Sequence, residues 1–144
     1  METLIEIMRK VLADAYAFQL KAHNYHWNVE GPNFSQYHDF LGNLYQEVYN
    51  SVDATAEEIR ALDAYSPGSF TRFLELTDIE CETTIPQPLE MMARLIVDNE
   101  KVLNTLNMAF KLANEFDQQG LADYIAGRID VHKKHAWMLR SFTR

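Results

Sequence analysis

The sequence predicts an all-α fold, with four long helices and a short one between the second and the third. Apolar residues recur at intervals of three and four over four long stretches, which is the spacing of amphipathic helices. Breaks that contain glycine or proline separate these stretches near positions 31–32, between 66–68 and 86–88, and at 117–120. With 144 residues, of which 47% are hydrophobic, the chain is long enough for one domain, residues 1–144, with a substantial core.

The first predicted helix begins near the start of the chain and continues to about Trp27. Leu4, Met8 and Phe18 form part of its apolar side. Residues 28–33 contain a Gly-Pro pair, which predicts a turn and therefore an antiparallel hairpin with the next helix.

The second predicted helix spans residues 34–62 as one continuous helix, because its apolar residues keep the helical spacing throughout. At about 100° per residue, His38, Asp53 and Glu57 lie on the edge of the apolar stripe rather than within it. A helix of a small bundle can face a neighbouring subunit at that edge.

The remaining chain predicts a short helix and two long ones. Residues 69–76 have apolar spacing for about two helical turns, and Phe70 and Phe73 make this segment a candidate interface element. A third helix follows the prolines at 86 and 88, and a fourth follows residues 117–120. In the fourth helix, His132 and His135 flank two lysines, so we expect that pair to lie on a solvated face.

Four side chains form a candidate metal site: His26, His38, Asp53 and Glu57. Imidazole and carboxylate groups together suit divalent iron or zinc. Fifteen residues of helix separate His38 from Asp53 by roughly 22 Å along the axis, far beyond the ~2 Å length of a metal–ligand bond. One metal ion therefore cannot contact both residues within one chain.

A twofold axis resolves this separation. An antiparallel copy of the helix would place His38 of one subunit opposite Asp53 and Glu57 of the other, with the axis near residues 45–48 and Gln46 close to its symmetry mate. The alternative is that these residues have no metal role, because a lone surface histidine or an Asp–Glu pair one turn apart is usually only solvated.

Charge and composition limit the classes of function. The net charge of −8 argues against general affinity for nucleic acid or anionic membranes and suits a protein that attracts cations. A single cysteine excludes an intrachain disulfide framework and fits a reducing compartment. Charged residues interrupt the first 20 positions, so we expect neither a signal peptide nor a membrane span, and a cytoplasmic location.

The run from Lys21 to Phe34, KAHNYHWNVEGPNF, followed by His38, Asp53 and Glu57, resembles the Dps family of mini-ferritins. The resemblance extends weakly along the whole chain to Trp137. It implies a ferritin-like four-helix bundle with a short extra helix between helices two and three. It also implies a homo-oligomer, a hollow dodecamer.

The resemblance further implies a ferroxidase that oxidises Fe(II) to Fe(III), preferentially with hydrogen peroxide, stores the ferric product and protects against oxidative stress. By position, His26 and His38 would come from one subunit, and Asp53 and Glu57 from its partner. Many family members carry an acidic residue four positions after the second histidine, where this sequence has Gly42. A second iron would therefore have fewer protein ligands here.

Two aromatic residues near His26 have open roles. Trp27 is either part of the core or a sacrificial electron donor close to the iron chemistry. His23 precedes His26 by three residues, and we interpret it as a surface residue in preference to a group that supports the metal site.

Three hypotheses remain open. The leading one is an iron-oxidising and iron-storing protein. The second is a DNA-condensing protein of the Dps type, which the negative charge makes unfavourable. The third is a helical scaffold without metal. No Glu-x-x-His motif occurs, so the intrasubunit diiron site of larger ferritin-like bundles cannot be assembled from this chain.

Overall fold

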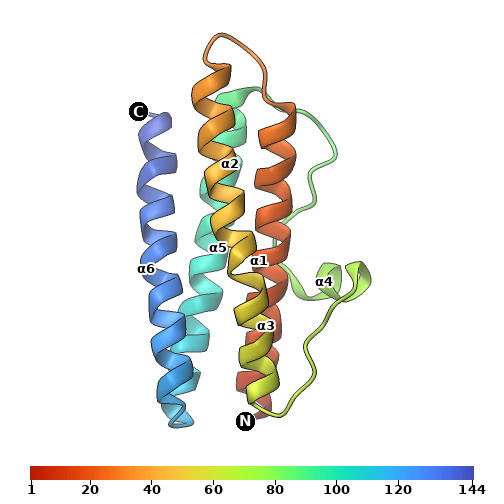
Figure 1. Cartoon of the computed structure of the whole chain (residues 1–144), viewed down its shortest axis with the longest axis vertical. Coiled ribbons are helices and arrows are strands. Elements are labelled where there is room, and N and C mark those ends of the chain that lie inside the picture. Colours follow the sequence, from red (N-terminus) through yellow and green to blue (C-terminus); the bar gives the residue numbers. More distant parts are fainter.

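The computed structural model describes residues 1–144. It contains six helices and no strand: α1 (Glu2–Asn28), α2 (Phe34–Asn50), α3 (Val52–Ala61), α4 (Phe70–Leu76), α5 (Pro88–Glu115) and α6 (Gln119–Phe142). Helices α1, α5 and α6, together with α2 and α3 placed end to end, form a four-helix bundle (Figure 1). The predicted all-α fold with a short helix between the second and third long helices is confirmed.

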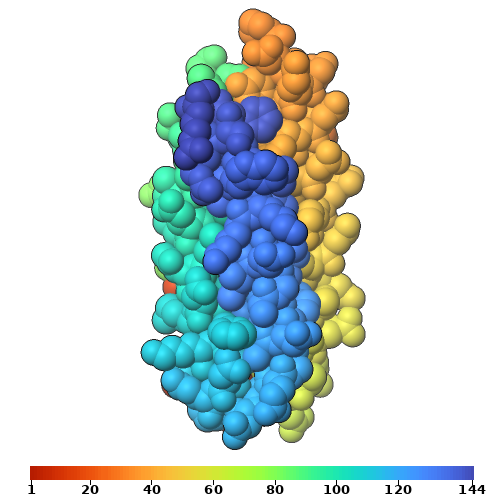
Figure 2. Space-filling view, turned by 90° about the vertical axis from the view of Figure 1, so that its left-hand side faces the viewer, coloured from red at the N-terminus to blue at the C-terminus, as the bar shows by residue number.

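The order of the helices requires a long connection across the bundle. α1 and α6 run in one direction, whereas α2, α3 and α5 run in the other (Figure 1). The chain must therefore return along the whole bundle between α3 and α5, and residues 62–87, including α4, make this crossing. Figure 2 shows the face away from α4, where α6 lies between α5 on one side and α2 and α3 on the other.

The predicted continuous helix over residues 34–62 is wrong at one point, because it bends at Ser51 between α2 and α3. The Ser51 amide and hydroxyl both donate to the carbonyl of Val48, at 3.0 and 2.6 Å. The Ser51 carbonyl accepts from the hydroxyls of Thr55, at 2.8 Å, and of Tyr124 on α6, at 3.2 Å. Side chains thus compete for the backbone groups that hold a straight helix together, and the helix bends.

The core lies along the axis of the bundle. A cluster of 25 buried apolar side chains includes Phe18 of α1, Leu44 of α2, Ile59 of α3, Leu95 of α5 and Ile125 of α6. Burying each such side chain stabilises the fold by about 1.5–3 kcal/mol, so the apolar stripes predicted from the sequence hold the four long segments together.

Buried polar contacts fix the connection between α4 and α5 to the bundle. The carboxylate of Asp14 on α1 is fully buried and accepts hydrogen bonds from Thr77 at 2.7 Å and from Thr105 of α5 at 2.8 Å. Further along, the hydroxyl of buried Tyr25 donates to Glu82. The connection is therefore held at two places, although it has no regular secondary structure.

The expectation of a solvated face at His132 and His135 is wrong, because both side chains are buried. His135 Nε2 lies 2.7 Å from a carboxylate oxygen of Glu47 on α2, and His132 Nδ1 lies 2.7 Å from the side-chain oxygen of Asn99 on α5. Arg128 donates two hydrogen bonds to the same Glu47, at 2.6 and 3.1 Å. The partners of His132 and His135 come from distant parts of the chain, so the neighbouring lysines of α6 do not predict whether the two histidines are buried.

Candidate metal centre

The two candidate histidines meet at the hairpin between α1 and α2. His26 is in the last turn of α1 and His38 in the second turn of α2, and their rings stack with centroids 3.8 Å apart and planes inclined by 16°. His26 Nδ1 lies 2.6 Å from the backbone carbonyl oxygen of His38, and His38 Nδ1 lies 2.7 Å from that of His26. Each ring is thus held by the backbone of the other residue.

These reciprocal contacts determine the tautomer of both rings. A carbonyl oxygen can only accept a hydrogen bond, so both Nδ1 atoms must carry the proton and donate it. In the neutral imidazole, the lone pair then lies on Nε2. A histidine held in this way, with one nitrogen donating to a carbonyl, presents the other nitrogen as a metal ligand.

Gly42 leaves room for the His26 ring. A Cβ atom at residue 42 would lie 2.9 Å from Cε1 and 3.1 Å from Nδ1 of His26, closer than ordinary van der Waals contact. A shift of the ring away from this Cβ would strain the one hydrogen bond that the ring makes, from Nδ1 to the His38 carbonyl. The residue noted above as a departure from the Dps pattern therefore has a steric role.

The two candidate carboxylates lie together on α3. Asp53 and Glu57 are one helical turn apart, and both are exposed. The hydrogen bond with Asp53, and then the repulsion between the two charges, raises the pKa of Glu57. A bound cation would relieve this repulsion, since it favours the charged form of both groups.

The structure does not bring the histidine pair and the carboxylate pair together in one chain. No group of three or more His, Cys, Asp or Glu side chains lies close enough together to hold a metal ion. The histidines lie at the α1–α2 end of the bundle, and α3 occupies the other half (Figure 1). Gln46, near the expected twofold axis, is exposed and free to contact another subunit, so the shared site stays a prediction.

Aromatic rings surround the histidine pair, and sequence reasoning missed most of them. His23 stacks on Tyr45 of α2 with centroids 3.7 Å apart and contacts Trp27 at 3.8 Å. Trp27 is 59% exposed, so its interpretation as a core residue is wrong. His23 is not a simple surface residue either: burial, and then the nearby His26, lowers its pKa. In the sequence, the spacing of three residues between His23 and His26 was the one indication that the two side chains lie close together.

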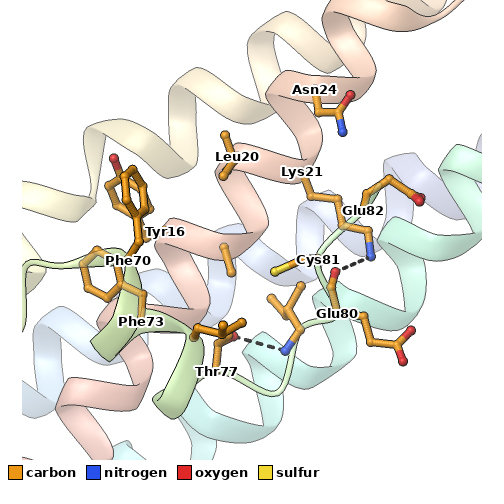
Figure 3. A pocket seen from close by; sticks show the side chains of 13 residues that line it. Tyr16, Leu20, Lys21, Asn24, Phe70, Phe73, Thr77, Glu80, Cys81 and Glu82 are labelled. Carbon is orange, nitrogen blue, oxygen red and sulfur yellow. Dashed lines mark hydrogen bonds between the residues drawn. The ribbon is translucent and has the colours of Figure 1, made fainter. Parts of the chain in front are cut away.

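A cavity of about 220 Å³ lies between α1, α4 and the connection that follows α4 (Figure 3). None of the four candidate ligands lines it. Tyr16 and Leu20 of α1 and Phe70 and Phe73 of α4 line it, with the rings of Tyr16 and Phe73 stacked at 4.8 Å, and Lys21 donates to the carbonyl of Glu80.

The helix that borders this cavity is almost entirely on the surface. α4 buries none of its residues, and Phe70 is 79% exposed. The expectation that α4 is an interface element stays a prediction. No helix of the chain has the length and apolar character needed to cross a membrane.

Comparisons with known proteins agree on the kind of fold. Residues 5–144 match the family model described as a ferritin-like domain. An uncharacterized low temperature-induced protein of Nostoc sp. is 36% identical over 96% of this chain and 79% of its own length. DNA protection during starvation protein 2 of Bacillus anthracis is 33% identical over 96% of this chain and 95% of its own length.

Solved structures agree as well. The crystal structure of a Dps protein from Bacillus brevis superposes with a TM-score of 0.95, at 27% identity, covering 99% of this chain and 96% of that one. The antigen TpF1 of Treponema pallidum superposes with a TM-score of 0.94, at 29% identity, covering 98% of this chain and 91% of the other. The similarity thus includes the whole bundle and the long crossing connection.

Proposed function

The chain belongs to the Dps family of ferritin-like proteins, and from that premise we propose that it binds and oxidises Fe(II) at sites shared between two subunits and stores the ferric product. In this proposal hydrogen peroxide is the oxidant, and twelve subunits form a closed shell. Iron is both the substrate and the stored material.

The observation that carries the proposal is the reciprocal hydrogen bonding of His26 and His38. It leaves two Nε2 atoms as free ligands at one place, already oriented and with the proton on the other nitrogen. Two ligands alone hold iron weakly, and the chain supplies no further acidic group there. The missing ligands must therefore come from another molecule.

Asp53 and Glu57 suit this role in a partner subunit. They are exposed, adjacent and too far from the histidines of their own chain, yet an antiparallel partner would present them at the histidine pair. The completed set of two imidazoles and two carboxylates suits Fe(II). Each Fe(II) gives one electron, so two Fe(II) reduce one peroxide to water when iron is in excess.

Trp27 has a secondary role in the proposal. It follows a ligand directly in sequence, and its ring is exposed near the site. An indole in that place is suited to donate an electron to a strong oxidant and so to protect the rest of the protein.

An anaerobic Fe(II) titration followed by hydrogen peroxide tests the ligands. Single replacements by alanine at His26, His38, Asp53 or Glu57 should weaken the first Fe(II) site and slow peroxide consumption, while circular dichroism shows the helical bundle intact. Wild-type affinity in any two of these variants would refute the ligand assignment.

Mixing two inactive variants tests whether the site is shared. One variant carries both His26→Ala and His38→Ala, and the other carries both Asp53→Ala and Glu57→Ala. Each alone has only defective sites, but a randomly co-assembled equal mixture should recover about a quarter of the wild-type sites, because half of the dimers are mixed and each mixed dimer has one intact site. No recovery after co-assembly would mean that the four residues do not act across an interface.

A further inference from the structure

Tyr45 links the histidine pair to a stack of rings that ends at the protein surface. Its ring centroid is 5.5 Å from that of His26 and 3.7 Å from that of His23, with the planes of Tyr45 and His23 inclined by 11°. His23 in turn contacts Trp27 at 3.8 Å, and Trp27 is 59% exposed. Rings in contact therefore lead from a candidate ligand to solvent.

The position of Tyr45 differs from that of the other tyrosines of α2. Tyr37 stacks with Phe142 of α6 at 5.3 Å and has no ring contact with either histidine ligand. Tyr49, one turn after Tyr45, has no aromatic partner within its chain and is exposed. Trp27 reaches the ligands only through His23, whereas Tyr45 contacts His26 itself. Among the tyrosine and tryptophan rings, Tyr45 is thus the one that pairs directly with a candidate ligand.

The chemistry at this site lacks an electron. This step rests on the proposed function: peroxide needs two electrons to become water, and Fe(II) gives one. Gly42 has no carboxylate for a second iron, and the His26 ring occupies the space that a side chain at residue 42 would need. When only one Fe(II) is bound, the second electron must come from the protein, or a hydroxyl radical is released.

We propose that Tyr45 supplies this second electron and that His23 connects it with Trp27. Fe(II) gives one electron and becomes Fe(III). The phenol of Tyr45 gives one electron and its proton and becomes a neutral phenoxyl radical. The O–O bond of peroxide breaks, and with both electrons and the proton of the phenol, peroxide leaves as one water molecule and one hydroxide ion.

The surroundings of Tyr45 fit the loss of a proton. Its hydroxyl oxygen accepts a long hydrogen bond from Gln46, at 3.4 Å, and its proton is not held by a carboxylate or a backbone carbonyl. The ring is half-buried, so water reaches it. His23 acts as a positioning residue, because its stacked ring fixes the orientation of the Tyr45 ring. It also lies between Tyr45 and exposed Trp27, so an electron can move from Trp27 to the Tyr45 radical, and external reductants have access to Trp27.

The test limits iron to one Fe(II) per site, bound anaerobically, and then adds one equivalent of hydrogen peroxide. Freeze-quench electron paramagnetic resonance detects protein radicals, a spin trap detects hydroxyl radical, and residual peroxide is measured. We expect the wild type to consume one peroxide per Fe(II) and to show a tyrosyl signal. Tyr45→Phe should lose that signal and raise the trapped hydroxyl radical, whereas Tyr37→Phe, the matched control whose ring stacks on Phe142, should behave as the wild type.

Several results would overturn the inference. A wild type that consumes half an equivalent of peroxide per Fe(II), without any protein radical, needs no electron from Tyr45. A tyrosyl signal that persists in Tyr45→Phe assigns the radical to another residue, and a radical lost only in Trp27→Phe makes the indole the first donor. These outcomes differ from failure of the proposed function, in which Fe(II) oxidation by peroxide would not depend on His26 or His38 at all.

Discussion

At residue 42 the absence of a side chain determines where the His26 ring can lie. The ring occupies the space that a Cβ atom would take, and from there it reaches the carbonyl of His38. The sequence shows only that an acidic residue common in the family is missing. The structure shows that the His26 ring fills the space beside residue 42. This contact joins two different helices, so the spacing of residues along the sequence could not predict it.

Gly42→Ala should separate metal binding from stability. Alanine in a helix is favoured over glycine by about 0.8–1 kcal/mol, so the bundle should stay folded. The new Cβ should displace the His26 ring and weaken its bond to the His38 carbonyl. Loss of such a supporting contact lowers metal affinity by roughly 10–100-fold, which an anaerobic Fe(II) titration measures.

Gly127→Ala is the matched control for this prediction. Gly127 lies in α6, and nothing lies within 4 Å of the Cβ atom that it would carry. This variant should gain helix stability and keep the wild-type Fe(II) affinity. If Gly42→Ala also binds Fe(II) as the wild type does, the close approach of the His26 ring to residue 42 has no functional importance.

The lowered pKa of Glu47 should make the free energy of unfolding depend on pH between about 4.5 and 2. Burial by itself raises the pKa of Glu47, but the hydrogen bonds from His135 and Arg128 outweigh it and lower the pKa to about 2. Because the folded pKa lies below the unfolded value of 4.5, the stabilisation is complete above pH 4.5 and is lost as pH falls towards 2.

Urea unfolding of Glu47→Gln at several pH values measures this contribution. At pH 7 the variant should be less stable than the wild type by about 1–3 kcal/mol, because half-buried Arg128 loses the carboxylate that it pairs with and buried His135 loses its hydrogen-bond partner. The difference should shrink as pH falls from 5 towards 2. A difference that stays constant over this range would show that the charge of Glu47 is not the source of the stability.

At the scale of elements, the sequence predicted the helices well and their irregularities poorly. The boundaries of α1 and α5 follow from Gly-Pro and proline signals beside them in the chain. The bend at Ser51 depends on Tyr124, 73 residues away, and the burial of His135 depends on Glu47, 88 residues away. Local periodicity contains no information on such partners.

Asp14 should be essential for fixing the crossing connection. Asp14→Ala removes the acceptor of Thr77 and Thr105 and leaves a buried space, so we expect a loss of about 2–4 kcal/mol in the free energy of unfolding. Asp78→Ala is the control, since its exposed ion pair with Lys10 should contribute no more than about 1 kcal/mol. Equal effects of the two variants in urea unfolding would show that Asp14 has no special role.

At the scale of the whole molecule, the proposed site is an assembly property. The sequence predicted that one chain cannot hold the metal, and the fold agrees, because histidines and carboxylates occupy different halves of the bundle. Which surfaces meet is a matter of shape and not of periodicity. The exposed side of α4 and the exposed Gln46 are the features that a structure of the assembly would have to bury.

The charge of the molecule predicts that it does not condense DNA. Each chain carries a net charge of −8, and an assembly of twelve would repel phosphates strongly. A gel-shift titration at neutral pH and about 150 mM monovalent salt should show no complex. Added Mg²⁺ is the control, because divalent cations can bridge two negative surfaces. A saturable shift without Mg²⁺ that weakens with salt would reveal a basic patch on the assembled surface.

If His26 and His38 bind Fe(II) as proposed, their reciprocal contact also lowers the entropy cost of that binding. Flexible side chains that become ordered on binding lose rotamer freedom, at about 0.5–1.5 kcal/mol each. The side chains of His26 and His38 lose this rotamer freedom when the hairpin folds, so both imidazoles have their binding rotamers before any ion is present. Hydrogen exchange of the hairpin amides should therefore be the same with and without metal, and ordering on binding should be confined to the exposed carboxylates of α3.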